Sequence, residues 1–171
     1  MYLSKILITI IFTELAVGIL VIGLFLYFVK NKATQRAKMR EAILQKQASS
    51  FGNATWFPVR YSSHKYFQSI WKFFAWENSG VMFLDEGSIF FIPESQITPS
   101  LNFDLNSSKT FVNWLGMKLW PNGFVYWFSI KSNGETHYFT SETGTFIFTS
   151  QKTTKDIYNK LQEYIGKINR A

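Results

Sequence analysis

The first thirty positions of the chain are almost continuously apolar. From Ile6 to Val29 the sequence runs for 24 residues with a single ionisable side chain, Glu14. A helix rises about 1.5 Å per residue, so this stretch is long enough to cross a hydrocarbon core of roughly 30 Å. The apolar region of a cleaved signal peptide is shorter, about 7 to 15 residues. The pattern predicts an uncleaved transmembrane anchor over residues 1–29.

Residues 30–52 follow this apolar stretch and are polar and basic. They are rich in Ala, Lys, Gln, Glu and Arg, which favour helix, and they hold no Pro and no Gly before Gly52. We therefore expect the transmembrane helix to continue as a basic juxtamembrane helix or linker.

From residue 53 to the end at residue 171 the pattern predicts one further domain. Short apolar runs alternate with turn signals at 121–123 (PNG), 133–134 (NG) and 142–144 (ETG), and apolar residues recur at every second position, as in strands. Two strands each carry one predicted apolar face: Phe111, Leu115, Met117 and Leu119 on the first, and Phe124, Tyr126, Phe128 and Ile130 on the second. The seven predicted strands are 56–62, 80–85, 88–92, 110–120, 124–131, 135–141 and 145–149.

The last apolar pattern has the period of a helix. In TTKDIYNKLQEYIGKINR, which begins at Thr153, Asp156 follows the threonine at the spacing of a capping box. The apolar positions lie three and four residues apart and form one stripe. These positions are Ile157, Leu161, Tyr164, Ile165 and Ile168.

This order of elements, seven antiparallel strands and then one amphipathic helix, resembles the pleckstrin-homology superfold with its GRAM-like variants over residues 56–169. The resemblance implies an α+β fold in which a partly open β-barrel is capped by the C-terminal helix and binds lipids, peptides or proteins. Members that bind phosphoinositides carry a basic cluster between the first two strands. Here that loop holds only Lys65 and Lys72, so phosphoinositide recognition is not carried over.

Composition and charge narrow the function classes. Aromatic residues make up 19% of the chain, enough for a core, and the absence of cysteine excludes disulfides and thiolate chemistry. The net charge is +7, but residues 30–50 contain six basic residues and one acidic residue, whereas residues 51–171 contain 11 basic and nine acidic residues. Because the basic charge is beside the anchor and not spread over the folded domain, no nucleic-acid partner is expected.

The basic residues after the apolar stretch also predict orientation. By the positive-inside rule they place the C-terminal domain in the cytoplasm. They could in addition contact anionic membrane lipids, and we regard setting the topology as the simpler explanation. The residues are Lys30, Lys32, Arg36, Lys38 and Arg40.

Glu14 is the one acidic residue inside the apolar stretch. On a helix it shares a face with Gly18, one turn away, and intramembrane acids usually mark a contact or a pathway. We therefore expect this face to dock against another membrane protein. The alternative is that Glu14 faces headgroups or water without a partner.

The stretch FTELAVGIL, residues 12–20, is also similar to the N-terminal helix of type IV pilins and pseudopilins. In those proteins a Phe-Thr start, a buried Glu and an apolar run precede a mostly β head. The similarity covers about twenty residues and departs from the family pattern at two points. Ile11 stands where pilins have Gly or Ala before the Phe, and Glu14 follows Phe12 by two residues instead of four.

The segment YFQSIWKFFAW, residues 66–76, is the most aromatic part of the chain. It is either a short helix or an extended segment. One interpretation is that it covers the core or an open edge of the barrel, as aromatic clusters usually do. The other is that its aromatic residues contact the bilayer interface or a partner. The residues concerned are Trp71, Phe73, Phe74 and Trp76.

No catalytic or metal-binding signature is visible. His64 and His137 are the only histidines, and the sequence holds neither a Gly-rich phosphate loop nor a His-Glu-x-x-His motif. We expect no enzyme, no cofactor and no metal. Two functions follow: a single-pass membrane protein whose cytoplasmic domain binds a protein or lipid, or a structural subunit docked into a larger membrane assembly through its helix.

Overall fold

The computed structural model describes residues 2–52, 54–72, 74–95, 98–107, 109–142 and 153–170, with side chains from Ile11 onward except at Val29. The chain divides into two compact units, Met1–Ala37 and Lys38–Ala171. Each unit is described by itself.

Helix α1, Tyr2–Phe51, runs without a break through the apolar stretch and the basic segment after it. Among the residues described, this is the one helix long and apolar enough to cross a membrane. It ends at Gly52, which has a φ of 46° and donates its N–H to the carbonyl of Ala48 at 3.1 Å. A left-handed glycine is a common helix stop, since it lacks the Cβ that disfavours this conformation. The predicted continuation of the helix is confirmed.

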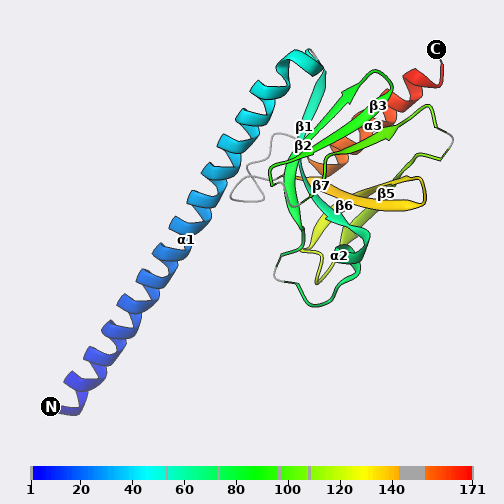
Figure 1. The fold of residues 1–171 in the computed structure, drawn as a ribbon. Coiled ribbons are helices and arrows are strands. Elements are labelled where there is room, and N and C mark those ends of the chain that lie inside the picture. Colours follow the sequence, from blue (N-terminus) through cyan, green and yellow to red (C-terminus); the bar gives the residue numbers. More distant parts are fainter. Residues whose placement is uncertain are drawn as a thin grey trace. The chain divides into compact units, whose positions relative to one another are not determined.

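Seven strands lie within the described residues and form one open antiparallel sheet in the order β4-β3-β2-β1-β7-β6-β5 (Figure 1). The central strand β1 pairs with β2 on one side and with β7 on the other. The strands are β1 (Thr55–Ser63), β2 (Asn78–Asp85), β3 (Ser88–Pro93), β4 (Leu101–Asp104), β5 (Phe111–Lys118), β6 (Val125–Ser132) and β7 (Glu135–Ser141).

The predicted α+β class, with its antiparallel sheet and C-terminal helix, is confirmed, and six predicted strands match observed ones. The prediction missed β4, a strand of only four residues that pairs with β3. The predicted strand 145–149, and most of the turn at 142–144, fall outside the described residues.

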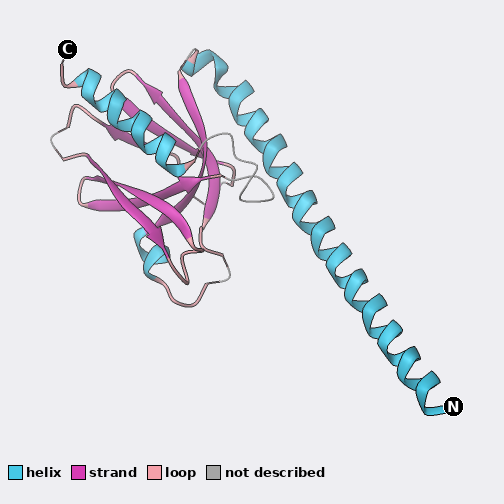
Figure 2. Cartoon of the chain, turned by 180° about the vertical axis from the view of Figure 1, so that it is seen from behind, coloured by secondary structure: helices cyan, strands magenta, loops and turns pink. Residues whose placement is uncertain are grey.

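Two helices accompany the sheet. The short helix α2, His64–Gln68, follows β1 directly and contacts β1 and β7. The longer helix α3, Thr154–Ile168, packs against β5, β6 and β7 and lies across the strands in Figure 2. Its start is the predicted capping box: the Thr153 hydroxyl accepts from the backbone N–H of Asp156, and the carboxylate of Asp156 accepts from the backbone N–H of Thr153.

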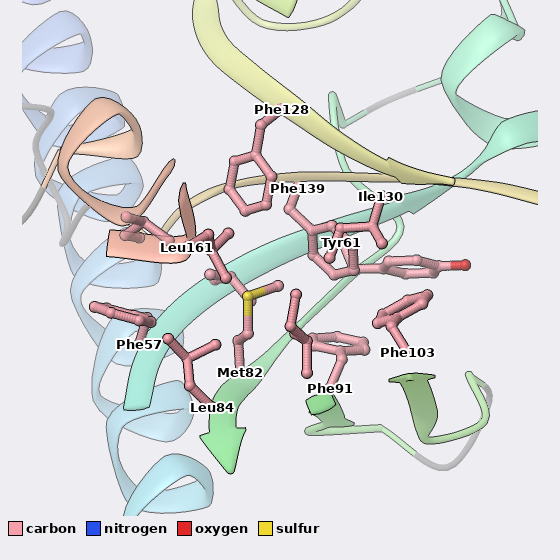
Figure 3. Close-up of a cluster of buried hydrophobic side chains, with 13 residues drawn as sticks. Phe57, Tyr61, Met82, Leu84, Phe91, Phe103, Phe128, Ile130, Phe139 and Leu161 are labelled. Atoms are coloured by element: carbon pink, nitrogen blue, oxygen red, sulfur yellow. The ribbon is translucent and has the colours of Figure 1, made fainter. Parts of the chain in front are cut away.

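The main core lies on the face of the sheet that α3 covers (Figure 3). Phe139 is fully buried at its centre, with ring centroids 5.4 Å from Phe91 and 5.6 Å from Phe128. Helix α3 contributes Ile157 and Leu161, which have no exposed surface. The other buried members are Phe57, Val59, Tyr61, Met82, Leu84, Ile89, Phe103 and Ile130.

A second, smaller cluster lies on the opposite face of the sheet. Trp127 is fully buried there although its neighbour Phe128 points into the main core, because successive strand residues point to opposite faces. Ala75 and Tyr138 complete the buried part of the cluster, and half-buried Phe67 and Trp76 cover it.

The single apolar face predicted for strand 110–120 is wrong, and the positions predicted to share a face on strand 124–131 are only partly buried. Phe128 and Ile130 are buried as expected, but the other predicted positions of that face are exposed, and so are three of the four on the preceding strand. One reason is a bulge between Trp114 and Gly116, where the register shifts and Gly116 adopts a φ of 73°. The exposed residues are Phe111, Met117, Leu119, Phe124 and Tyr126.

Candidate functional site

The aromatic segment after β1 is divided between inside and outside. Phe67 stacks on Tyr138 with ring centroids 3.9 Å apart and meets Trp127 edge-on at 5.1 Å. Trp76 is half-buried, and the guanidinium of Arg60 lies 3.7 Å from the centre of its ring. These side chains cover the second cluster, as the packing interpretation expects.

Other side chains of the same segment point into solvent. Trp71 is 95% exposed, and Ile70 and Phe74 are also mostly exposed. Phe73 falls outside the described residues. Some residues of this segment therefore cover the second cluster, and others present an apolar surface to solvent.

The connection from β5 to β6, residues 119–124, presents a second group of exposed apolar side chains. Leu119 and Phe124 are mostly exposed, and Trp120 is 71% exposed. The peptide between Trp120 and Pro121 is cis, and Gly123 adopts a φ of 82°, which glycine tolerates because it has no Cβ.

The two connections are bound to each other. The ammonium group of Lys72 donates to the side-chain oxygen of Asn122 at 2.5 Å and to the carbonyls of Tyr66 and Phe67 at 3.3 and 3.2 Å. A Cβ added at Gly123 would lie 2.7 Å from the Cβ of Ala75, so the two backbones approach closely there.

Two further hydrogen bonds order the same region. The indole N–H of the buried Trp127 donates to the carbonyl of Asn122 at 3.0 Å. The hydroxyl of Tyr66 donates to the carbonyl of Phe74 at 3.2 Å and ties the start of the aromatic segment to its end. Both connections are thus fixed on the second cluster by side chains that face inward.

Together the connections form one apolar feature, which we call the two-loop surface. The residues between its members are held by the hydrogen bonds described above. The members are therefore exposed on ordered loops and not on loosely packed ones. The members are Ile70, Trp71, Phe74, Leu119, Trp120 and Phe124.

Lys72 is the charged group at the centre of the contact between the loops. Burial lowers the pKa of its ammonium group from the ordinary value of 10.5. Its hydrogen bonds all go to neutral oxygens of Tyr66, Phe67 and Asn122. Lys72 therefore holds the loops together, whereas Lys65 on α2 is exposed to solvent.

The residues predicted from the anchor lie on α1. Glu14 and Gly18 are one helical turn apart and exposed along the chain, and no atom lies within 4 Å of a Cβ added at Gly18. Lys30, Lys32 and Lys38 are also exposed, and Arg36 is half-buried. Their predicted contacts with lipids and with another membrane protein stay predictions.

Arg40 differs from the other predicted basic residues. Its guanidinium donates to the carboxylate of Glu142 at 2.8 Å, and that carboxylate side chain is only 6% exposed. Farther along the same segment, Phe51 stacks on Phe83 with ring centroids 4.5 Å apart. Within the second unit, Phe51 therefore packs on β2, and Arg40 is bound to Glu142, just after β7.

The rest of the described chain offers less. Within it, no group of three or more His, Asp or Glu side chains is placed to hold a metal ion. His137 and His64 each pair with a tyrosine, through Tyr61 at 3.1 Å and Tyr138 at 3.0 Å. A hollow of about 400 Å³ lies between residues 43–47 of α1 and residues 92–95 and 98–100, and it is lined by mixed polar and apolar side chains.

The sequence pointed to one of the two connections that form the two-loop surface. Aromatic density located Trp71 and Phe74, but Leu119 and Phe124 were assigned to strand faces and Trp120 was not singled out. A signal was available in LWPNGF, where large apolar residues stand on both sides of a turn sequence, and turns usually lie at the surface.

Comparison of the chain with protein-family models, with curated proteins and with solved structures gives no match.

Proposed function

We propose that this chain is a single-pass, membrane-anchored, non-enzymatic binding protein. Its pleckstrin-homology-like domain faces the cytoplasm and engages a protein or lipid partner through the two-loop surface. The observation that carries this proposal is the surface itself. Large apolar side chains that are exposed together, on a framework of ordered loops, are typical of interaction sites.

The sheet supports the pleckstrin-homology-like assignment. Seven described strands follow one another as two antiparallel meanders that meet where β1 pairs with β7, and α3 lies across the second meander. A fold of this kind is a scaffold, and its function depends on the site that it carries. The two-loop surface is that site in our proposal.

The membrane anchor rests on α1. Its apolar part is long enough to span a bilayer, and five basic residues follow it closely, whereas only Lys5 and the amino terminus precede it. That asymmetry favours a cytoplasmic C-terminal domain, and it gives Lys30, Lys32 and Lys38 anionic lipid headgroups as partners.

Single-cysteine labelling tests whether the surface is occupied. The chain contains no cysteine, so Trp71→Cys or Trp120→Cys reports on one position. In native membranes we expect maleimide to react more slowly there than at the control Asn102→Cys, an exposed position on β4. Equal or faster reaction at Trp71→Cys and Trp120→Cys would show that nothing covers the surface and would contradict the proposal.

The same control variant tests orientation. A maleimide that cannot cross membranes should leave Asn102→Cys unlabelled in intact cells and should label it after the cells are permeabilised. Labelling of intact cells would place the domain outside and overturn the cytoplasmic assignment.

A second candidate function rests on α1. Glu14 and Gly18 place a hydrogen-bonding group and a small residue on one helix face, which is typical of helix–helix contacts in membranes. In this case the chain is an accessory subunit docked into a larger assembly. Replacing residues 1–29 by an unrelated span should then abolish its association, whereas a binding protein that uses the two-loop surface should keep it. Glu14→Gln and Glu14→Leu test the same contact with single changes.

A further inference from the structure

The side chains of the two-loop surface have the chemistry of the membrane interface. Two are indoles, two are phenyl rings and two are branched aliphatic groups. Tryptophan favours the headgroup level of a bilayer, and Phe, Leu and Ile favour the acyl boundary just below it. Every member is exposed by more than half, so each side chain is available to a membrane surface.

Charge around the surface suits anionic headgroups. The segments that carry it, 64–76 and 118–124, hold three lysines, Lys65, Lys72 and Lys118, and no Asp or Glu, and Lys72 is bound between the loops. The acidic residue that follows the first stretch, Glu77, accepts the backbone N–H of Ser63 at 3.1 Å. Lysines beside exposed aromatic rings are typical of segments that bind the surface of anionic membranes.

Covalent linkage would keep the second unit near the bilayer that holds the anchor. Lys38, the first residue of the second unit, is nine residues after Val29, where the apolar stretch ends. Nine residues span at most about 32 Å even when fully extended. An anchored chain therefore meets lipid headgroups continuously, whereas it meets a soluble partner only by diffusion.

The loops are ordered before any contact is made. The hydrogen bonds of Lys72 to Asn122 and of Trp127 to the Asn122 carbonyl fix both connections, and the approach of Gly123 to Ala75 leaves little room for rearrangement. A surface that is already in place loses little conformational entropy when it binds. This favours a simple planar partner that demands no induced fit.

From these observations we infer that the two-loop surface inserts into the interfacial layer of a bilayer containing anionic lipid, so that the domain is held by a second contact besides its anchor. The inference rests on the proposed function and names the partner of the same surface.

Quenching of tryptophan fluorescence by lipid tests the inference on the full chain. The chain is placed in nanodiscs of phosphatidylcholine and phosphatidylglycerol, with and without brominated acyl chains. We expect brominated lipid to quench the wild type, and the double variant Trp71→Phe/Trp120→Phe to lose most of that quenching. Trp114→Phe, a change at a half-buried indole packed on Tyr158, is the matched control and should keep it. Equal quenching of the wild type and the double variant overturns the inference.

Photo-crosslinking in native membranes separates the two proposals. Benzoylphenylalanine is introduced at Trp71 or Trp120, with Phe111, exposed at the far end of β5, as the control position. Lipid adducts at 71 and 120 but not at 111 support the inference. Protein adducts at 71 and 120 overturn it and leave the proposed binding function intact. No adduct at either position, together with rapid maleimide labelling, overturns both.

Discussion

The two hydrophobic clusters of the sheet unit both contain aromatic residues, but they differ in how completely they are covered. In the main core every central side chain is buried, and Phe91, Phe103, Phe128 and Phe139 pack edge-on or stacked on one another (Figure 3). The second cluster has three buried members, Ala75, Trp127 and Tyr138. Beyond its half-buried cover of Phe67 and Trp76, it continues outward into the six exposed side chains of the two-loop surface.

The difference indicates that the exposed aromatic residues are not needed to cover the core. Trp127 needs a cover, and Phe67 and Trp76 supply it from within the same segment that exposes Trp71. A loop that only sealed the sheet would have polar residues at the outward positions, because exposed apolar clusters promote association. The outward residues therefore point to a contact with a second surface.

The largest expected effect is in the main core. Phe139→Ala removes a fully buried ring that packs against Tyr61, Phe91 and Phe128, and it should lower the free energy of unfolding by about 3–5 kcal/mol. Urea unfolding of the full chain in detergent, followed by circular dichroism, measures the change. A loss below about 1 kcal/mol would show that the core is not packed as described.

A smaller effect is expected where the two loops meet. Lys72→Met keeps the aliphatic stem and removes hydrogen bonds to Asn122, Tyr66 and Phe67, so stability should fall by about 1–2 kcal/mol. The loss stays modest because burial of the ammonium group, which lowers its pKa, already opposes folding. Hydrogen exchange should rise in residues 66–76 and 119–124. If exchange rises equally throughout the sheet, Lys72 has no local role in ordering the loops.

Tyr61, a buried member of the main core, gives the unit a pH-dependent stability. Burial, followed by the negative charges of Glu77 and Glu135, raises the pKa of Tyr61 from 10.0 to about 12. The unfolded chain ionises this tyrosine at lower pH than the folded chain, so its contribution is intact below pH 10 and is lost as pH rises from 10 to about 12.

Tyr61→Phe should therefore reduce the fall in the urea midpoint between pH 10 and 12. Part of the fall should remain, because burial also raises the pKa of Tyr138 and of Tyr66. Below pH 10 the free energy of unfolding of the variant should be lower by about 0.5–1.5 kcal/mol, because the hydrogen bond to His137 is removed. Tyr126→Phe, at an exposed tyrosine on β6, is the control and should leave the whole profile unchanged.

The smallest expected effect on folding is at the surface. Trp71→Ala should change the free energy of unfolding by less than about 0.5 kcal/mol, because Trp71 is almost fully exposed. Trp127→Ala, the same change at a buried indole, should cost about 3–5 kcal/mol. A loss above about 1 kcal/mol at Trp71 would mean that it packs on the domain, and the contrast between the clusters would fail.

Much of the fold could be read from local patterns, because strand alternation and helix capping depend on neighbouring residues. The pair of Thr153 and Asp156 was found in this way, and so was the continuous helix up to Gly52. Strand β4 was missed because its alternation, Leu101 and Phe103, covers only two apolar positions. A pattern that short does not stand out from the loops around it.

The candidate site could be predicted only in part, because half of it depends on contacts between distant residues. The bulge at Gly116 is defined by the pairing of β5 with β6, and it changes which side chains face the core. The pair of Arg40 and Glu142 joins residues 102 positions apart. From the local sequence, Arg40 was grouped with the basic residues expected beside the membrane, and its pairing with Glu142 could not be predicted.

Among the described strands, β4 and β5 form the two edges of the open sheet, and neither is suited to pairing with a strand of another chain. β4 offers only four residues, which is too short for a stable added strand. β5 is interrupted by its bulge. In addition, the side-chain amide of Gln162 donates to the carbonyl of Val112 at 3.3 Å, so this carbonyl is already engaged. The described strands should therefore not add edge to edge between copies of the protein, even at high protein concentration.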